Sequence, residues 1–253
     1  MTQNIPVENQ PFLYINGLQV TNDATTPNTK IDLAAGSARD STDTMDIILS
    51  TAVVINAAAN GAINRLDQGT FAASLVYAVY VIGDSSNKNQ PAGLLSLASN
   101  AVPLLPFGYD SFRKVGYAVS DASVHFLKAY IAGNNNYRRF VYDAPQATSV
   151  TAGTSATYAA IDLHTLVPAV DQTPVLFRAN WTANAAADTF NMQGGNSTGD
   201  QWTMIAPVAG GTAHTVGFGS VLSQLVAGVP TSNYKVSAVG GVAINVAAFD
   251  FFI

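Results

Sequence analysis

Glu and Lys are almost missing from this chain. Fifteen of its sixteen acidic residues are Asp, with Glu8 as the one Glu, and Lys occurs only five times in 253 residues. Glu and Lys normally populate the solvent-facing sides of helices, whereas Asp, Asn, Thr, Ser and Gly favour turns and strands. Hydrophobic residues still make up 48% of the chain, so a core can form. The sequence therefore predicts an all-β protein rather than a helical one.

Period-two patterns of β-branched and aromatic residues predict strands throughout the first half. These patterns cover residues 12–15, 18–21, 74–82, 124–131 and 137–142. Asn16–Gly17 separates the first two strands and predicts a tight hairpin, because both central residues of such a turn adopt positive φ. The Asn-rich run 133–136 predicts a second hairpin with a longer turn. In the strand at 74–82, the alternation predicts one wet and one dry face.

The second half continues the same class of pattern. Its predicted strands are 157–163, 175–181, 214–219, 234–239 and 242–249. Two segments, 47–59 and 221–227, are the only ones that suggest a helix. The Ser, Thr, Val and Ile content of the first favours a strand, and the second is too short to be a stable helix by itself.

A polar, Pro-containing segment at 143–149 predicts a linker between two domains. We expect two β-sandwich or jelly-roll-like domains. The N-terminal β-domain, 1–143, would anchor or oligomerise the protein, and the C-terminal β-sandwich would span 150–253. The apolar ending Phe251–Ile253 is expected to be buried, either in a domain core or between protomers.

Composition excludes several functional classes. A net charge of −5 with only eleven Lys and Arg residues argues against nucleic-acid binding, which needs clustered basic residues. The absence of Cys removes disulfides, thiolate catalysis and Cys-type zinc sites. Apolar stretches such as 51–59 are too short to cross a bilayer, so no membrane insertion is expected. The first residues lack the basic and apolar regions of a secretory signal, which predicts synthesis in a cytoplasm.

One segment matches a catalytic pattern. Gly195-Asn196-Ser197-Thr198-Gly199 satisfies the nucleophile-elbow motif, whose chemistry needs a strand before the Ser and a helix after it. The flanking residues, 191–194 and 200–202, indicate a polar loop instead. We therefore interpret the segment as a Gly-rich loop and predict that the protein is not an enzyme.

No metal or cofactor site is predicted. Asp40, Asp43 and Asp46 recur every third residue, but without the alternating ligands of a calcium loop, so capping of turns is the favoured interpretation. The histidines lie far apart, without metal-ligand spacing; they are His125, His164 and His214. Each is expected to be a hydrogen-bonded histidine in or beside a strand.

A few residues have binding chemistry without a diagnostic pattern. Arg138–Arg139 have the chemistry to grip a phosphate or sugar, but the favoured interpretation is that they lie on the two faces of one strand, with one Arg paired to an Asp across a subunit boundary. Trp181 and Trp202, with Tyr158, offer flat faces of the kind that stack on sugars. Both Trp residues are equally credible as core or interface anchors.

Five segments together resemble virion proteins of tailed bacteriophages. They are Gly36–Ile47, Leu66–Thr70, Tyr77–Ser86, Leu94–Ser96 and Pro106–Gly116, and the most specific piece is Gly108-Tyr109-Asp110-x-x-Arg113-x-x-Gly116. The resemblance covers about a third of the chain. It implies a structural particle component of fibre, adaptor or decoration type, oligomeric and commonly trimeric, without transferable catalytic residues.

Arg113 has a further expected role within this block. Its planar, always-charged guanidinium suits locking a nearby carboxylate. Asp110 and Asp67 are the expected partners.

These observations predict a virion protein that acts by binding and assembles in the host cytoplasm. The leading hypothesis is a head- or tail-fibre subunit that forms a homotrimer and contacts other virion proteins. One alternative is a capsid decoration or cement protein. A second alternative is a receptor-binding module that recognises a host surface glycan through Trp181, Trp202 or Tyr158.

Overall fold

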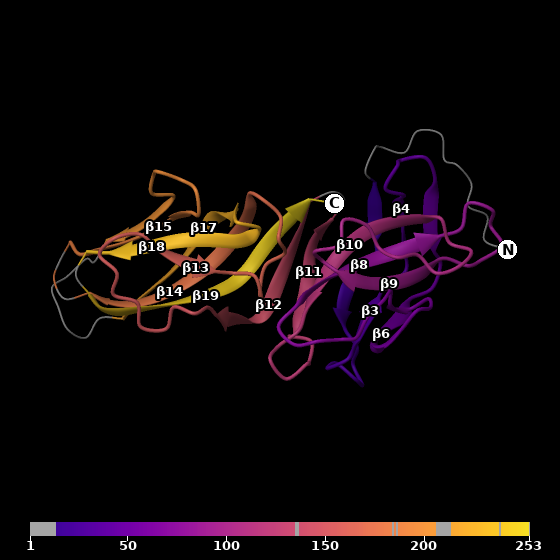
Figure 1. Cartoon of the computed structure of the whole chain (residues 1–253), viewed down its shortest axis with the longest axis horizontal. Coiled ribbons are helices and arrows are strands. Elements are labelled where there is room, and N and C mark those ends of the chain that lie inside the picture. Colours follow the sequence, from indigo (N-terminus) through magenta and orange to yellow (C-terminus); the bar gives the residue numbers. More distant parts are fainter. Residues whose placement is uncertain are drawn as a thin grey trace. The chain divides into compact units, whose positions relative to one another are not determined.

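The protein is all-β. A computed structural model (Figure 1) describes residues 14–134, 137–183, 185, 187–205, 214–237 and 239–252. No helix occurs within these ranges, and the β-sandwich or jelly-roll-like fold class is confirmed. The chain divides into two compact units. Unit 1 comprises Met1–Asp143 with Phe251–Ile253, and unit 2 comprises Ala144–Asp250.

Unit 1 contains one small and one large sheet. Its strands are β1 (Ile15–Gly17), β2 (Val20–Asn22), β3 (Lys30–Leu33), β4 (Gly36–Arg39), β5 (Asp46–Leu49), β6 (Val53–Asn60), β7 (Arg65–Leu66), β8 (Val76–Gly83), β9 (Ala92–Leu97), β10 (Ser111–Val119), β11 (Ala129–Asn134) and the start of β12 (Tyr137–Ala147). The small sheet has the order β1-β4-β5, and the large one runs β10-β8-β9-β7-β6-β3-β2-β11-β12. The short strand β7 pairs parallel with β6 and β9, whereas β8 pairs antiparallel with both β10 and β9.

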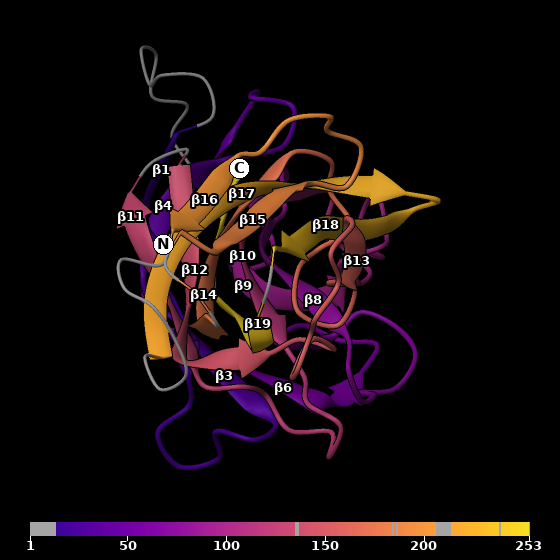
Figure 2. The ribbon, with the colours of Figure 1, turned by 90° about the vertical axis from the view of Figure 1, so that its left-hand side faces the viewer.

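Unit 2 is a two-sheet arrangement with long strands (Figure 2). They are β13 (Ala159–Asp162), β14 (Thr173–Ala183), β15 (Thr189–Gly194), β16 (Trp202–Ile205), β17 (His214–Val226), β18 (Val229–Val236) and most of β19 (Val239–Phe252). One sheet has the order β19-β14-β17, and the other places β18 between β13 and β15, followed by β16. Strand β14 alternates buried and half-buried residues along its whole length, as expected for a strand with one face on a core. A tight turn at Ala227–Gly228, both at positive φ, joins β17 to β18.

The hairpin predicted at Asn16–Gly17 is wrong. Strand β1 pairs with β4, and β2 pairs with β3 and β11, so the chain passes from the small sheet to the large one at this point. Gly17 and Leu18 both have positive φ, at 68° and 51°. Leu18 is fully buried, whereas a hairpin turn would place the corresponding side chain in solvent. The sequence therefore indicated the positive-φ turn, but not that this turn connects two different sheets.

The second predicted hairpin is confirmed by the pairing of β11 with β12 from Ala129↔Tyr142 to Asn134↔Tyr137. Residues 135 and 136 of its turn lie outside the described residues. Both helix-like segments are strands, because 47–59 falls in β5 and β6 and 221–227 falls largely in β17. In contrast, β8 does not have the expected wet face, since all eight residues are buried. A Cβ added at Gly83 would lie 3.1 Å from Ile47, so the small sheet covers this end of the strand.

The segment 143–149 contains the division between the two units, at Asp143 and Ala144, but its first part is a strand rather than an irregular linker. Strand β12 continues to Ala147, and the Thr148 N–H then donates to the Ile244 carbonyl at 3.1 Å. The apolar C-terminus is core at the positions described: Phe249 is fully buried, and Phe251 packs edge-on against Tyr117 with ring centroids 4.9 Å apart. The Phe252 side chain and Ile253 lie outside the described residues.

Candidate functional site

The nucleophile-elbow hypothesis fails on geometry. The segment Gly195–Gly199 lies between β15 and β16, so a strand and not a helix follows it. The Ser197 hydroxyl is exposed and donates to the Gly199 carbonyl of its own loop at 3.2 Å. At the start of the loop, the Asn196 N–H donates to the Gln224 side chain. The segment is a Gly-rich loop, as expected, but residues 191–194 before it were wrongly interpreted as a polar loop, since they lie in the buried strand β15.

Asp side chains organise turns. The Asp40 carboxylate accepts the Thr44 and Met45 N–H groups at 2.7 and 2.9 Å and the Thr42 hydroxyl at 2.5 Å. Burial opposes ionisation here, but these hydrogen bonds prevail and lower the Asp40 pKa. No group of three or more His, Asp or Glu side chains suited to a metal ion occurs in the part of the chain that is described.

Two further carboxylates are held in the same way. Asp84 accepts the Ser86 hydroxyl at 2.6 Å and the N–H groups of Ser86 and Asn89, and its pKa falls to about 2, chiefly through the Ser86 hydroxyl. The pKa of Asp23 is also about 2, because the Thr26 hydroxyl and N–H donate to it. Asp84 and Asp23 therefore each hold a polar loop between two strands in place.

The aromatic residues proposed for sugar stacking are occupied. Trp181 is 1% exposed and therefore belongs to the core of unit 2. Trp202 lies flat on β17, where a Cβ added at Gly219 would fall 2.0 Å from its ring. Tyr158 has the Lys235 ammonium 4.4 Å from its ring centroid. The glycan hypothesis therefore loses Trp181 outright and finds one face of each other ring covered.

Arg138 is a structural residue, not a ligand grip. It is completely buried, and its guanidinium donates to three main-chain carbonyls, those of Gly17 at 2.6 Å, Leu18 at 2.9 Å and Val115 at 3.0 Å. Burial lowers its pKa to about 10. The side chain thus satisfies the irregular chain crossing between the two sheets of unit 1 and cannot reach a soluble phosphate or sugar.

The partners expected for Arg113 are also wrong. Its guanidinium donates to the Asp40 carbonyl at 3.5 Å, and the charges of Asp43 and Asp40 oppose the lowering of its pKa by burial. Asp110 instead binds the Ser85 N–H and hydroxyl, and Asp67 accepts the Leu104 N–H at 2.9 Å. The lock therefore joins β10 to the β4–β5 turn.

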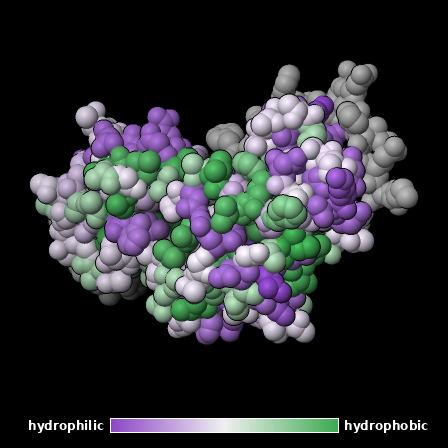
Figure 3. Space-filling model, turned by 45° about the vertical axis from the view of Figure 1, so that its right-hand side comes forward, coloured by the Kyte–Doolittle hydropathy of each residue, from purple (hydrophilic) through white to green (hydrophobic). Residues whose placement is uncertain are grey.

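A rigidly held apolar loop is the most distinctive surface feature of unit 1. Between β9 and β10 the side chains of Val102, Leu104 and Phe107 are exposed by 61%, 56% and 105%. We call these three residues the apolar tip. Exposed apolar groups of this kind normally mark interaction surfaces when they occur together. Figure 3 shows apolar surface patches set between polar ones.

Side chains from outside the loop hold the apolar tip in place. Asp67 accepts the Leu104 N–H, and the Asn89 amide donates to the Gly108 carbonyl at 2.9 Å. The Tyr109 hydroxyl donates to the Gln90 carbonyl at 2.7 Å. Gly108 itself has a φ of 85°, which few other residues adopt without strain. The Phe107 ring is therefore presented on a fixed backbone.

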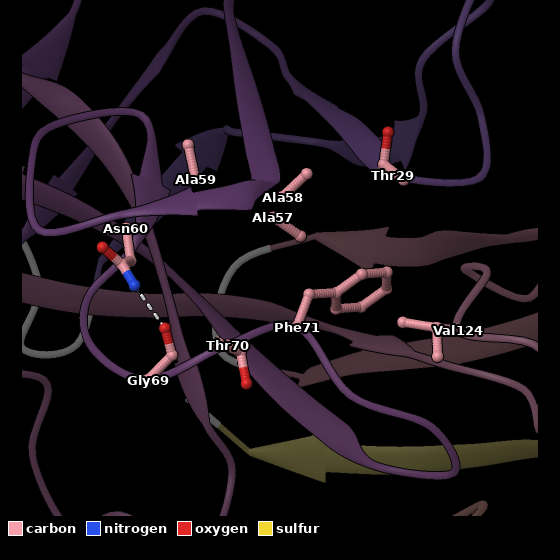
Figure 4. Close-up of a pocket in the computed structure, with 9 residues that line it drawn as sticks. All are labelled: Thr29, Ala57, Ala58, Ala59, Asn60, Gly69, Thr70, Phe71 and Val124. Carbon is pink, nitrogen blue, oxygen red and sulfur yellow. Dashed lines mark hydrogen bonds between the residues drawn. The ribbon is translucent and has the colours of Figure 1, made fainter.

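A concave site of about 330 Å³ lies elsewhere on unit 1 (Figure 4). Its lining is Thr29, Ala57, Ala58, Ala59, Asn60, Gly69, Thr70, Phe71 and Val124, and we call it the alanine pocket. None of these nine side chains is charged. Phe71 belongs to an aromatic cluster, with ring centroids 4.6 Å from Phe126 and 5.5 Å from Tyr77. The site can hold an uncharged apolar group.

The walls of the alanine pocket are preformed. Asn60 donates to the Gly69 carbonyl across one end (Figure 4), and the Tyr77 hydroxyl accepts the Ala72 N–H at 2.9 Å. The Ser120 hydroxyl donates to the Ala72 carbonyl at 2.7 Å. The loop after β7 is thus tied to β6, β8 and β10, so a ligand would not have to order it.

A third feature, the Tyr130 cleft, has about 210 Å³ and a polar rim. It is lined by Thr21, Asn22, Lys128, Ala129, Tyr130 and Asp143. The Tyr130 side chain is 48% exposed, and Thr21 is its neighbour across the β11–β2 pairing. The Lys128 ammonium lies 3.3 Å from the Asp143 carboxylate. Aromatic face, hydroxyl and paired charges therefore meet at one concave place.

Sequence reasoning did not find these three features. Pro106 and Gly108 are turn-forming residues, and together with the apolar residues around them they were the available signal for an exposed tip. The alanine pocket depends on residues from four separate segments, and no spacing in the sequence joins them. Of the histidines, His125 is exposed and His164 binds Asp162 at 2.7 Å, while the His214 side chain lies outside the described residues.

Comparison with known proteins gives no identity. No family model and no curated protein matches the chain. Among solved structures, the carbohydrate binding module CBM6cm-2 from Cellvibrio mixtus lichenase 5A, in complex with cellotriose, is similar over 50% of this chain and 87% of its own, at 12% identity and a TM-score of 0.23. The VP2 subviral particle of infectious bursal disease virus is similar over 97% of this chain and 73% of its own, at 12% identity and a TM-score of 0.18.

A structure of the Gx strain of the same virus is similar over 94% of this chain and 71% of its own, at 11% identity and a TM-score of 0.19. TM-scores this low carry no conclusion about the fold or function of this chain. No helix in the described ranges is long and apolar enough to cross a membrane.

Proposed function

We propose that the chain is a non-catalytic structural subunit of a tailed-phage particle that acts by binding copies of itself and other virion proteins. The observation that carries this proposal is the apolar tip. Phe107 is fully exposed on a loop whose Gly108 carbonyl accepts a hydrogen bond from Asn89 and whose Leu104 N–H donates one to Asp67. Holding an apolar ring in water has no benefit for the isolated chain, whereas it prepares a contact with a partner.

The charge distribution supports assembly as well. Unit 2 contains only seven charged residues, of which two are basic and five are Asp, so its surface carries little charge. Surfaces low in charge lose little hydration when they are covered by another subunit. The resemblance of residues 36–121 to tailed-phage virion proteins adds the location in a virion. Within that class, a head- or tail-fibre subunit forming a homotrimer is the leading form, and a cement protein is the alternative.

Sedimentation of the purified full-length chain tests the assembly step. We expect a concentration-dependent species of three chains, and a monomer at every concentration would overturn the proposal. Imaging and protein quantification of the intact particle test the location. Copy number that follows the capsid subunits supports the cement form, a small fixed number supports the fibre form, and absence from purified particles contradicts both.

A second candidate function, recognition of a host surface glycan, is favoured by the Tyr130 cleft. Sugar sites combine an aromatic face with polar groups that fix orientation, and this cleft places the exposed Tyr130 ring beside Thr21 and the Lys128–Asp143 pair. This location differs from the three aromatics that the sequence suggested. The ligand class is a neutral or mixed-charge saccharide, because the rim charges compensate each other.

Binding to an array of bacterial surface glycans tests this second function. We expect Tyr130→Ala to abolish binding. Tyr137→Ala is the matched control, since Tyr137 is 45% exposed on the neighbouring strand but does not line the cleft. Equal binding by Tyr130→Ala and the unaltered chain would exclude the cleft, and absence of any glycan binding would exclude the function.

A further inference from the structure

We propose that Phe107 of one chain inserts into the alanine pocket of a second copy of the same chain. The inference rests on the proposed assembly function and names the surfaces that would carry it. Both parts belong to unit 1, so every copy supplies one Phe107 ring and one pocket. No other protein is then needed to satisfy either surface.

The Phe107 ring is not covered by its own chain, so only another molecule would bury it. Its side chain is 105% exposed, and the loop is tied by the Asn89–Gly108 and Tyr109–Gln90 hydrogen bonds. The loop backbone therefore cannot carry the ring onto its own unit without breaking these bonds. Val102 and Leu104 of the same loop are also exposed.

The alanine pocket has the size and chemistry for a phenyl ring. A dry apolar cavity of about 150 Å³ is enough to bind benzene, and the alanine pocket offers about 330 Å³. Ala57, Ala58 and Ala59 leave space because their side chains are single methyl groups. Phe71 provides an aromatic partner, and aromatic pairs gain from tilted or edge-on contacts. With no charge among the nine lining residues, insertion would not bury an unpaired charge.

The geometry of such a contact has consequences for assembly. Tip and pocket are different surfaces, so the interface is heterologous: each chain donates its tip to one neighbour and accepts a tip from another. A heterologous contact forms a closed ring when the rotation closes and a filament when it does not. Three copies with three tips filling three pockets would give the expected homotrimer.

A single insertion is a weak contact. One buried aromatic side chain contributes about 150–250 Å², well below the roughly 800 Å² per partner of a standard interface. Closing a ring adds a contact without a further loss of freedom for a free chain, which raises the overall affinity. The closed oligomer is therefore expected to form cooperatively with concentration, with few open dimers.

The test uses two variants that each remove one half of the contact. Phe107→Ser removes the ring but keeps the pocket, and Ala58→Trp fills the pocket but keeps the tip. Each is expected to weaken self-association about 10- to 100-fold in sedimentation, the effect of one buried aromatic group. Ile205→Ser is the matched control, since Ile205 is 62% exposed in unit 2 and its loss should leave self-association unchanged. Circular dichroism melts verify that all three variants fold.

Mixing the two variants gives the decisive measurement. The pocket of Phe107→Ser and the tip of Ala58→Trp can form one contact, so at high concentration the mixture should form more dimer than either variant alone, and no larger ring. If the unaltered chain associates and both variants associate equally well, this inference is wrong and the proposed assembly function stands. If the unaltered chain does not associate at all, the assembly function itself is wrong.

Discussion

Unit 1 carries nine of the eleven Lys and Arg residues of the chain, whereas unit 2 carries two. This difference in basic residues parallels a difference in how the main-chain N–H and carbonyl groups of each unit are hydrogen-bonded. Strand β14 of unit 2 pairs over most of its length with both β17 and β19, so ladder bonds suffice. Unit 1 has short strands and irregular crossings, and there side chains complete the hydrogen bonding.

The two cores also differ, because the core of unit 1 relies more on polar side chains than that of unit 2. In unit 1, Arg138 reaches three carbonyls from a fully buried position, and Asp40 and Asp84 organise adjacent turns. In unit 2, shape dominates, because Trp202 packs on the bare backbone of Gly219 and edge-on against Phe190 at 5.5 Å. We infer that unit 1 is sensitive to loss of polar groups and unit 2 to changes in volume.

Arg138→Ala should produce the largest effect. It leaves three buried carbonyls without their donor and opens a cavity, and the relief of the buried charge offsets only part of this. We expect the unfolding free energy of unit 1 to fall by about 3–5 kcal/mol. Both tryptophans lie in unit 2, so their fluorescence reports that unit, while far-UV circular dichroism reports both. The early transition should appear in the dichroism alone.

Two further variants sharpen this measurement. Arg138→Lys keeps a charge with fewer donors and should give an intermediate loss. Lys128→Ala removes an exposed ion pair and should change stability by less than about 0.5 kcal/mol. If tryptophan fluorescence shifts as much as the dichroism in Arg138→Ala, the two units unfold in one transition, and a stability cannot be assigned to each unit separately.

Gly219→Ala should act on unit 2. The added Cβ would lie 2.0 Å from the Trp202 ring, so the ring or the strand must move. Overpacking of this kind lowers the unfolding free energy by about 1–3 kcal/mol, and tryptophan fluorescence should detect it. Gly199→Ala is the matched control in the same unit, because a Cβ there meets nothing within 4 Å. Equal melting of both variants would show that the Trp202 contact does not stabilise the sandwich.

The same contrast explains what the sequence could predict about the fold. Alternation is a local property, so β13, β14, β17, β19 and the β11–β12 hairpin were predictable from their residues, whereas β15 and β16 were missed. The crossing at Gly17–Leu18 was not, because its outcome depends on Arg138, some 120 residues later in the chain. The segment 143–149 has the composition of a linker, yet its pairing with distant strands makes it part of β12 and its extension.

The candidate site was less accessible from the sequence. Turn capping by Asp follows from spacing of a few residues, and it was predicted for Asp40 and its neighbours. Phe107 was visible as an aromatic residue in a turn, but exposure depends on what the rest of the fold leaves uncovered. The alanine pocket combines Thr29, Phe71 and Val124 with β6, and only tertiary pairing brings these segments together.

Acid should destabilise unit 1 more than unit 2. The pKa values of Asp23 and Asp84 are about 2 in the folded chain, compared with an ordinary 3.8. A lowered folded pKa stabilises above the unfolded value, and this contribution is lost as the pH falls from about 4 through 2. Asp32 has a raised pKa, from burial and the nearby Asp23 charge, and opposes the trend in part. The dichroism melting temperature should therefore drop before the tryptophan transition does.

The double variant Asp23→Asn with Asp84→Asn removes both titrating groups. It should be less stable at neutral pH and show a flatter decline between pH 4 and 2. An unchanged slope would mean that other carboxylates control the acid response of unit 1.

A small effect is expected from Lys235→Met in unit 2. The Lys235 ammonium lies 4.4 Å from the Tyr158 ring centroid and 3.4 Å from the Asp200 carboxylate, an arrangement worth about 0.5–1 kcal/mol when partly exposed. Because Met keeps the packing of the aliphatic stem, chemical denaturation followed by tryptophan fluorescence isolates the charge. A double-mutant cycle with Tyr158→Leu separates the ring contact from the ion pair. A loss as large as that of Arg138→Ala would show that unit 2, despite its two basic residues, depends on electrostatics as much as unit 1 does.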